Sequence, residues 1–233
     1  MLKIICSICA RGGSKGIINK NMKKIDGNPL IYYTIQQAID SKIFEKIIVS
    51  SDDNKILNYS KKHNVDLQIK RKKSLSNSKT NKVDAIRDLL LKSEKKFNTK
   101  YDIIIDLDVT SPLRNISDIK NALNKFIKNK SSILMTCCES RKNPYYNIVE
   151  RKKNVIKVVK KQIKKITRRQ DAPKTYDLNA SIYIWKRNVL LKYNSLFHKN
   201  TSLYVMKQEN SMDIDTLEDF NYVKWKILQK KKL

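Results

Sequence analysis

The alternation of short apolar runs with segments of helical periodicity is the feature that most limits what this chain can fold into. Apolar runs within 3–10, 45–53 and 101–108 are typical of strands buried on both faces of a sheet. Between them, 29–41 and 83–97 carry apolar residues three and four positions apart, which predicts helices with one buried face. Strands separated by helices favour right-handed crossovers, so we predict an α/β protein with a three-layer, mainly parallel sheet.

The second half of the chain interrupts this alternation once. A helix at about 117–128 and a strand at 132–138 continue the pattern. The segment 141–176 then lacks a helical stripe and is typical of short strands joined by polar turns. After it, apolar runs at 181–186 and 202–207, which predict strands, and a terminal helix restore the pattern. We therefore predict a core made of 1–140 and 177–233, with an inserted arm at 141–176.

Neither a membrane span nor a secretory leader is expected. No apolar run approaches the roughly 20 residues that cross a bilayer, and the apolar stretch 4–10 leads into a charged loop rather than a cleavage site. We expect a cytoplasmic protein whose four cysteines are reduced thiols. Cys6 and Cys9 form a C-x-x-C inside an apolar run, where packing is favoured over metal binding.

The formal net charge of +28 leaves two classes of partner open. A basic surface attracts phosphate, which raises a nucleic-acid-binding module as one interpretation. However, 41 of the 50 basic residues are Lys, and they are scattered through nearly every segment. A dedicated nucleic-acid surface favours clustered Arg and exposed aromatic side chains. We therefore favour small anions, such as nucleotides and acid sugars, over nucleic acid.

Ligands of such sheets bind beyond the carboxyl ends of the strands. Three segments directly follow strands and are expected around one crevice: 11–20, 51–53 and 106–114. The first is Gly-rich and basic, so its backbone N–H groups and the side chains of Lys15 and Lys20 could hold a polyphosphate. A tight turn with solvated surface lysines explains the same residues equally well.

Two pairs of aspartates, each spaced two positions apart, are candidates for metal binding. Asp213 and Asp215 would face the same side of an extended chain and could share Mg²⁺ with phosphate oxygens. Asp215 could instead cap the terminal helix. Asp106 and Asp108 repeat this spacing at a strand end, where they would be exposed to the crevice or accept a backbone N–H from the following turn.

Polar residues at the end of the arm could bind an acid sugar. Arg168 and Arg169 suit a bidentate grip on a carboxylate, or else form an exposed surface pair. Asn179 could hydrogen-bond a sugar hydroxyl or terminate a turn. No nucleophile set of the Ser/His/Asp or Cys/His type is evident, and neither His63 nor His198 has a clear partner.

In combination, these motifs resemble the acylneuraminate cytidylyltransferase (CMP-sialic acid synthetase) family over nearly the whole chain. The matching segments, in chain order, are ICARGGSKGIINKN, IIVSSDD, DVTSPLR, RRQDAP, LNASIYI and SMDIDTLED. The resemblance implies a nucleotidyltransferase fold of Rossmann-like type, with 141–176 as a dimerisation arm of a homodimer. It also implies that CTP and an acid sugar react to give a CMP-sugar and pyrophosphate, with Mg²⁺ as the cofactor.

The same resemblance assigns roles to individual residues. The implied catalytic residues are Lys15, Asp213 and Asp215, and the two aspartates are the implied Mg²⁺ ligands. The implied CTP contacts are Arg11, Gly12, Ser14, Lys15, Lys20, Asn21, Arg71 and Asp108. The implied sugar contacts are Tyr146, Arg169, Gln170 and Asn179.

Departures from the family pattern indicate a particular branch. Where sialate enzymes commonly have Q-P-T-S-P-L-R and R-P-x-G-A, this chain has DVTSPLR and YDLNA, and Arg71 is followed by Lys72 rather than proline. Together with NPYYN at 143–147, these changes resemble the branch that acts on legionaminic acid more than the one that acts on N-acetylneuraminate. Pseudaminate, 3-deoxy-octulosonate and another nucleotide are alternative substrates, and an RNA-binding module is the alternative outside enzymes.

Overall fold

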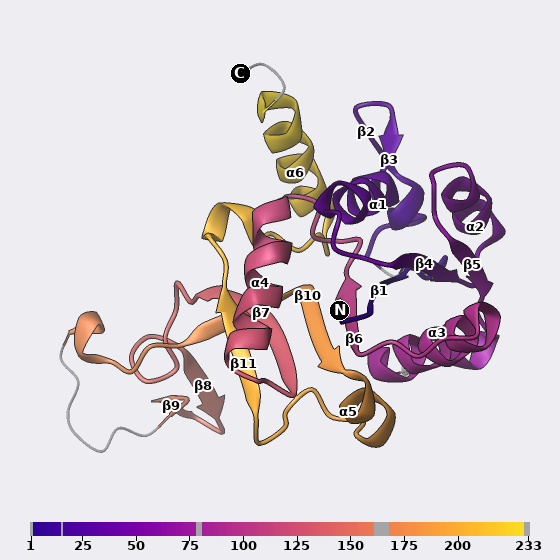
Figure 1. The fold of residues 1–233 in the computed structure, drawn as a ribbon. Coiled ribbons are helices and arrows are strands. Elements are labelled where there is room, and N and C mark those ends of the chain that lie inside the picture. The colour runs from indigo at the N-terminus through magenta and orange to yellow at the C-terminus, as the bar shows by residue number, and fades with distance from the viewer. Residues whose placement is uncertain (1, 15, 78–80, 161–167, 231–233) are drawn as a thin grey trace.

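A seven-stranded sheet forms the centre of the molecule (Figure 1). The computed structural model describes residues 2–14, 16–77, 81–160 and 168–230. The strands of the sheet are β1 (Ile4–Cys9), β4 (Lys46–Ser51), β5 (Leu67–Lys70), β6 (Ile103–Leu107), β7 (Ile133–Glu139), β10 (Tyr176–Lys186) and β11 (Thr201–Val205). They lie in the order β11-β7-β10-β6-β1-β4-β5. The predicted apolar runs therefore supply the strands.

Most neighbouring strands are parallel. β1 pairs in parallel with β4 and β6, β4 pairs with β5, and β7 pairs with β11. β10 is the exception, because it runs antiparallel between β6 and β7. Within the described residues, no α-helix lies between β7 and β10, and a return without a helical crossover is antiparallel. The prediction of a mainly parallel sheet is confirmed.

Helices cover both faces of the sheet, as predicted for three layers. One apolar core includes α1 (Leu30–Ser41), α2 (Asn54–Lys61), α4 (Ile116–Lys128) and α6 (Leu217–Lys230), and a second includes α3 (Lys82–Phe97) and α5 (Arg187–Lys192). In α1, Ile31, Ile35 and Ala38 share one face and are at most 1% exposed. Within the described residues, no helix is long and apolar enough to span a bilayer.

Short elements connect these layers. A hairpin of β2 (Lys24–Ile25) and β3 (Asn28–Pro29) precedes α1, and Pro29 is the residue just before that helix rather than its first residue. The remaining turns of the core are the 3-10 helices η1 (Lys20–Met22), η2 (Lys73–Leu75) and η4 (Gln208–Asn210).

The segment 141–176 projects away from the sheet, at the left of Figure 1. It carries a hairpin of β8 (Val149–Lys152) and β9 (Val155–Val158), followed by the 3-10 helix η3 (Arg169–Asp171). The predicted short strands are therefore present, whereas residues 161–167 of the predicted arm lie outside the described residues. Apolar side chains stay exposed on the hairpin, with Val149 at 58% and Ile156 at 68%.

The strand predicted at 181–186 is longer in the structure, since β10 begins at Tyr176. Its register against β7 shifts between Leu178 and Tyr183, and Ala180 adopts a left-handed backbone conformation with φ 52°. Such a bulge re-aims the neighbouring side chains. At this bulge Asn179 is buried, with only 4% of its surface exposed.

Candidate active site

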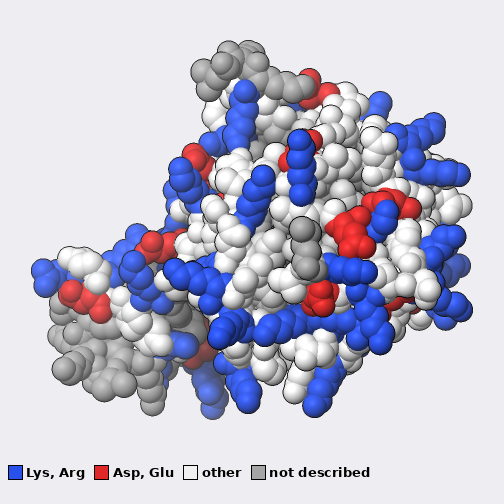
Figure 2. Space-filling model, in the orientation of Figure 1, with Lys and Arg blue, Asp and Glu red and all other residues white. Residues whose placement is uncertain are grey.

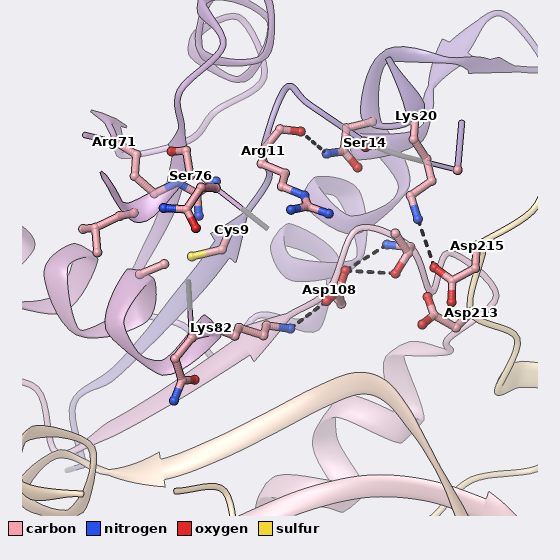
Figure 3. Close-up of a pocket in the computed structure, with 17 residues that line it drawn as sticks. Cys9, Arg11, Ser14, Lys20, Arg71, Ser76, Lys82, Asp108, Asp213 and Asp215 are labelled. Atoms are coloured by element: carbon pink, nitrogen blue, oxygen red, sulfur yellow. Dashed lines mark hydrogen bonds and ion pairs between the residues drawn. The ribbon is translucent and has the colours of Figure 1, made fainter. Parts of the chain in front are cut away.

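A pocket of about 500 Å³ lies at the carboxyl edge of the central strands (Figure 3). It is bordered by residues that follow β1, β5 and β6, as the strand-end rule predicts. The residues that line it include Cys9, Arg11, Ser14, Gly16, Lys20, Asn21, Arg71, Ser76, Asn77, Asn81, Lys82, Asp108, Thr110, Asp213 and Asp215. The basic loop after β1 and the acidic segment before α6 thus converge on one cavity, as the sequence predicts.

The loop after β1 is anchored at both ends. Asn21 Nδ2 donates to the carbonyl of Arg11 at 2.9 Å, and the N–H of Gly12 donates to Asp52 Oδ1 at 2.9 Å. A Cβ atom on Gly12 would lie 2.9 Å from the Cβ of Asp53, so this close approach requires glycine. Lys15, predicted to be catalytic, lies outside the described residues.

The same loop touches the acidic segment directly. Lys20 Nζ donates to the carbonyl of Ile214 and lies 3.4 Å from Asp215 Oδ1. A Cβ atom on Gly16 would collide with the carbonyl oxygen of Asp215, so the two backbones can pack this closely only with glycine at that position. The predicted phosphate loop and the predicted metal pair are therefore in contact.

The two aspartates of the acidic segment offer unshared oxygens. Asp213 Oδ1 is buried without a hydrogen-bond partner in the described structure, and burial raises the pKa of Asp213 although Thr110 opposes this by hydrogen bonding. The Asp215 side chain is 78% exposed. Asp215 is not the side chain that caps α6, because Thr216 Oγ1 accepts the N–H of Asp219, and Asp219 in turn accepts from the N–H groups of Thr216 and Asp215. These oxygens suit a hard divalent cation.

The second aspartate pair has a different environment from the one predicted. Asp106, expected at the crevice, is completely buried, and it accepts from Ser7 Oγ at 2.6 Å. Asp108 does line the pocket, and its Oδ1 accepts the backbone N–H of Thr110 at 3.2 Å, which was the alternative interpretation for this pair. Lys82 Nζ lies 2.8 Å from Asp106 Oδ2 and 2.6 Å from Asp108 Oδ2, so one ammonium group bridges both carboxylates.

This bridge shifts the pKa values of Asp108 and Lys82. Burial acts to raise the pKa of Asp108, but the charge of Lys82 outweighs it and lowers that pKa to about 2. Burial likewise acts to lower the pKa of Lys82, and the two carboxylates reverse this and hold it well above its ordinary value. Lys82 and Asp108 are therefore both charged at neutral pH.

Arg71 presents the opposite situation. Its backbone N–H donates to the carbonyl of Ser51 at 2.8 Å, which fixes the residue at the end of β5. The side chain is buried, yet Nε and Nη2 have no hydrogen-bond partner among the described residues. A buried guanidinium with free donors is suited to a planar or polyanionic ligand.

Two of the segments expected around the crevice contribute differently. Arg114 lies beneath the pocket with 2% exposure, and its guanidinium donates to the carbonyls of Ser181 and Asp108 and to Thr34 Oγ1. The segment 51–53 supports the loop from behind through Asp52, as described above. Of the predicted segments 51–53 and 106–114, only Asp108 and Thr110 line the pocket, whereas residues of 11–20 line it as predicted.

Several lining residues were not predicted, and apart from Cys9 they lie at the start of α3 or in the segment before it. Asn81 caps α3, because its Oδ1 accepts the N–H of Val83 at 3.0 Å. Lys82 is therefore the first helical residue, and helical side chains lean back toward the N-terminus, which here is the pocket. The Asn that precedes the predicted helix is the signal that could have located this wall.

The four predicted sugar contacts lie away from the first pocket. Arg169 and Gln170 line a second cavity of about 400 Å³ at the base of the arm. Asn179 is buried, where its Oδ1 accepts from Thr136 Oγ1 at 2.7 Å. Tyr146 is 38% exposed on the arm. None of these four residues lines the first pocket. Their role in sugar binding stays a prediction.

Relatives and solved structures share this architecture. The chain is 42% identical over 230 residues to post-translational flagellin modification protein B of Campylobacter coli, covering 99% of this chain and 97% of that protein. It is 46% identical over 227 residues to the CMP-N,N′-diacetyllegionaminic acid synthase of Campylobacter jejuni, covering 97% and 96%. A solved CMP:2-keto-3-deoxy-manno-octonic acid synthetase complexed with CTP matches the fold with a TM-score of 0.71 at 15% identity, covering 98% of this chain and 99% of that one.

The family comparison covers all the segments that carry the motifs. The family model described as "Cytidylyltransferase" matches residues 5–232, which is nearly the whole chain. The match includes the loop after β1, the strand-end aspartates and the acidic segment. The resemblance that the motifs indicate is therefore confirmed, and this chain belongs to the cytidylyltransferase family of nucleotidyltransferases.

Proposed function

We propose that this chain joins CTP to a nonulosonic acid of the legionaminate type, forming a CMP-sugar and releasing pyrophosphate. The observation that carries the proposal is the convergence of the basic loop and the acidic pair on one pocket. The name of the relative that is 46% identical supports this choice of sugar. The four free cysteines fit a cytoplasmic setting.

The cations of the pocket would bind and orient the triphosphate. Arg11, Lys20 and Arg71 line the cavity from three sides, and the free donors of Arg71 are available to a ligand. Their charge would offset that of the α-phosphate and of the leaving pyrophosphate while the anomeric hydroxyl attacks in line. Such a transfer depends on positioning and charge, so it requires no covalent intermediate with the protein.

Asp213 and Asp215 would hold Mg²⁺ in this reaction. No group of three or more His, Cys, Asp or Glu side chains that could hold a metal is found among the described residues, so phosphate oxygens and water would complete the coordination. A bound Mg²⁺ supplies charge that polarises the α-phosphate and lowers the pKa of a bound hydroxyl. The role of the protein would be to keep Asp213 Oδ1 buried and without a protein partner beside the basic loop.

We also propose that the arm pairs two copies of the chain into a homodimer. Val149, Val155 and Ile156 expose between 51% and 68% of their surface on one short hairpin, and exposed apolar clusters favour burial against a partner. Sedimentation equilibrium tests this. The substitution Ile156→Asp should yield monomers, whereas Lys153→Asp at the hairpin turn should leave dimers intact.

The activity is tested by measuring pyrophosphate release with CTP, Mg²⁺ and a panel of acid sugars. We expect the highest kcat/KM with a legionaminate, and lower values with pseudaminate, N-acetylneuraminate and 3-deoxy-octulosonate. No turnover with any of these sugars, together with tight, salt-sensitive RNA binding, would favour the RNA-binding alternative. On the face shown in Figure 2, Lys and Arg are spread widely with Asp and Glu among them, which favours the enzyme.

A further inference from the structure

Lys82 stands apart from the other cations of the pocket because its charge is already balanced. Its Nζ lies 2.8 Å from Asp106 and 2.6 Å from Asp108. The same group lies 4.6 Å from the centre of the Tyr183 ring, which adds a cation–π contact. By contrast, two donors of Arg71 have no partner among the described residues. Lys82 therefore has little charge to offer an incoming phosphate.

A continuous set of hydrogen bonds leads from Lys82 to the acidic segment. Asp108, which Lys82 contacts through Oδ2, accepts through Oδ1 from the backbone N–H and from Oγ1 of Thr110 at 3.2 and 3.0 Å. The carbonyl of Thr110 then accepts the N–H of Ile214 at 2.9 Å. Ile214 lies between Asp213 and Asp215, so the position of both carboxylates depends on this turn.

We propose that Lys82 is a positioning residue of the transferase: the fixed counter-cation of Asp106 and Asp108 that holds the Asp108–Thr110 turn against the acidic segment. Without the ammonium group, two adjacent carboxylates in a poorly solvated site would repel each other. Asp106 is anchored within β6, so Asp108 and its turn would move. This inference rests on the proposed function, because it assigns Lys82 a role in placing Asp213 and Asp215.

The test compares Lys82→Met, Lys82→Arg and the double variant Lys82→Met/Asp108→Asn with the wild-type chain. The matched control is Lys92→Met, because Lys92 lies on the same helix and forms a half-buried ion pair with Asp88, away from the pocket lining. Steady-state kinetics give kcat and the KM for CTP. The value of kcat is referred to the fraction of chains that bind CTP in calorimetry, so that a loss of folded protein is not counted as a loss of catalysis.

We expect Lys82→Met to lower kcat about 10- to 100-fold, as loss of a supporting residue behind metal ligands does, while the KM for CTP stays within about threefold. Lys82→Arg should retain most of the activity. The double variant should recover about tenfold relative to Lys82→Met, because it removes one of the repelling charges. A raised KM with unchanged kcat, unchanged kinetics, or a double variant no better than the single one would overturn the proposal.

Hydrogen exchange provides a readout that needs no substrate. The amide of Ile214 should exchange faster in Lys82→Met than in the wild-type chain, and the double variant should slow it again. Equal exchange in all variants would overturn the inference even if the enzyme is active. If the wild-type chain proves inactive with every acid sugar, the proposed function fails, and this exchange comparison still decides the role of Lys82. If Lys82→Met does not fold, the exchange rate of the Ile214 amide is compared instead among the double variant, Lys82→Arg and the wild-type chain.

Discussion

Two aspartate pairs have identical spacing and opposite environments, although only Asp106 of the four does not line the pocket. Asp106 and Asp108 are closed by Lys82, Ser7 and Thr110, and every link is a hydrogen bond or an ion pair. Asp213 and Asp215 are open, since Asp213 Oδ1 has no partner in the described structure and the side chain of Asp215 is 78% exposed. The spacing of two residues is the same in both pairs. The difference teaches that the surrounding side chains determine whether such a pair stabilises the fold or is available to a ligand.

The largest expected effect comes from the open pair. Asp215→Asn removes a proposed metal ligand, so kcat should fall at least about 100-fold, equivalent to about 2.7 kcal/mol. The folded protein should be as stable as the wild-type chain in thermal unfolding, because Asp215 is exposed. Glu218→Gln, an equal change of charge at an exposed position of α6, serves as the control and should keep normal turnover. Near-normal kcat in Asp215→Asn would remove the distinction between the pairs.

The closed pair should respond mainly in stability. Asp106→Asn weakens the contact with Lys82 and alters the bond from Ser7, so the free energy of unfolding should fall by about 2 kcal/mol. The kcat of the folded fraction should drop less than tenfold, because Lys82 still holds Asp108. Denaturant unfolding and kinetics measured on the same preparations check both parts. A large loss of kcat without a loss of stability would contradict the assignment.

Arg71 extends the comparison to a buried cation. Arg71→Met should raise the KM for CTP about tenfold, equivalent to about 1.4 kcal/mol. Without CTP, the variant should unfold at the same temperature as the wild-type chain or higher, because a buried guanidinium with unpaired donors is costly. The neighbouring exposed substitution Lys72→Met is the control for loss of charge alone. A destabilised variant with an unchanged KM for CTP would show that Arg71 stabilises the fold, as Asp106 and Lys82 do, rather than binding CTP.

The smallest expected effect is a difference in pH dependence between the pairs. The pKa of Asp108 is lowered to about 2, so its contribution to stability is present above the ordinary Asp pKa near 4 and is lost as the pH falls toward 2. The stability advantage of the wild-type chain over Asp108→Asn should shrink by about 1 kcal/mol between pH 5 and pH 3. Asp213 has a raised pKa, so its contribution is lost as the pH rises through that pKa. The wild-type chain should therefore lose stability relative to Asp213→Asn as the pH rises above 4, and equal slopes for both variants would contradict the comparison.

The sequence carried enough information for the sheet and for the convergence of the two functional segments. The apolar runs located the strands, because strands buried on both faces leave a continuous apolar signal. The strand-end rule then brought the basic loop to the pocket, and Asp213 and Asp215 could be chosen from their spacing. The family resemblance supplied the reaction, which no feature of spacing could have provided.

The contact of Lys82 with both Asp106 and Asp108 could not be predicted, for a specific physical reason. Lys82 is one of 41 lysines, so nothing in the sequence distinguished it from the others. Its role depends on the cap at Asn81, which sets where α3 begins and so aims the side chain at β6. Asn179 is a similar case, because its burial depends on the left-handed backbone of Ala180, a residue that rarely adopts that conformation.

The contact between Lys20 and Asp215 joins positions 195 residues apart. During synthesis on the ribosome, the basic loop emerges long before the aspartates that complete its pocket. A nascent or prematurely terminated chain would therefore lack the acidic half of the pocket, so such products should neither retain the nucleotide tightly nor consume it.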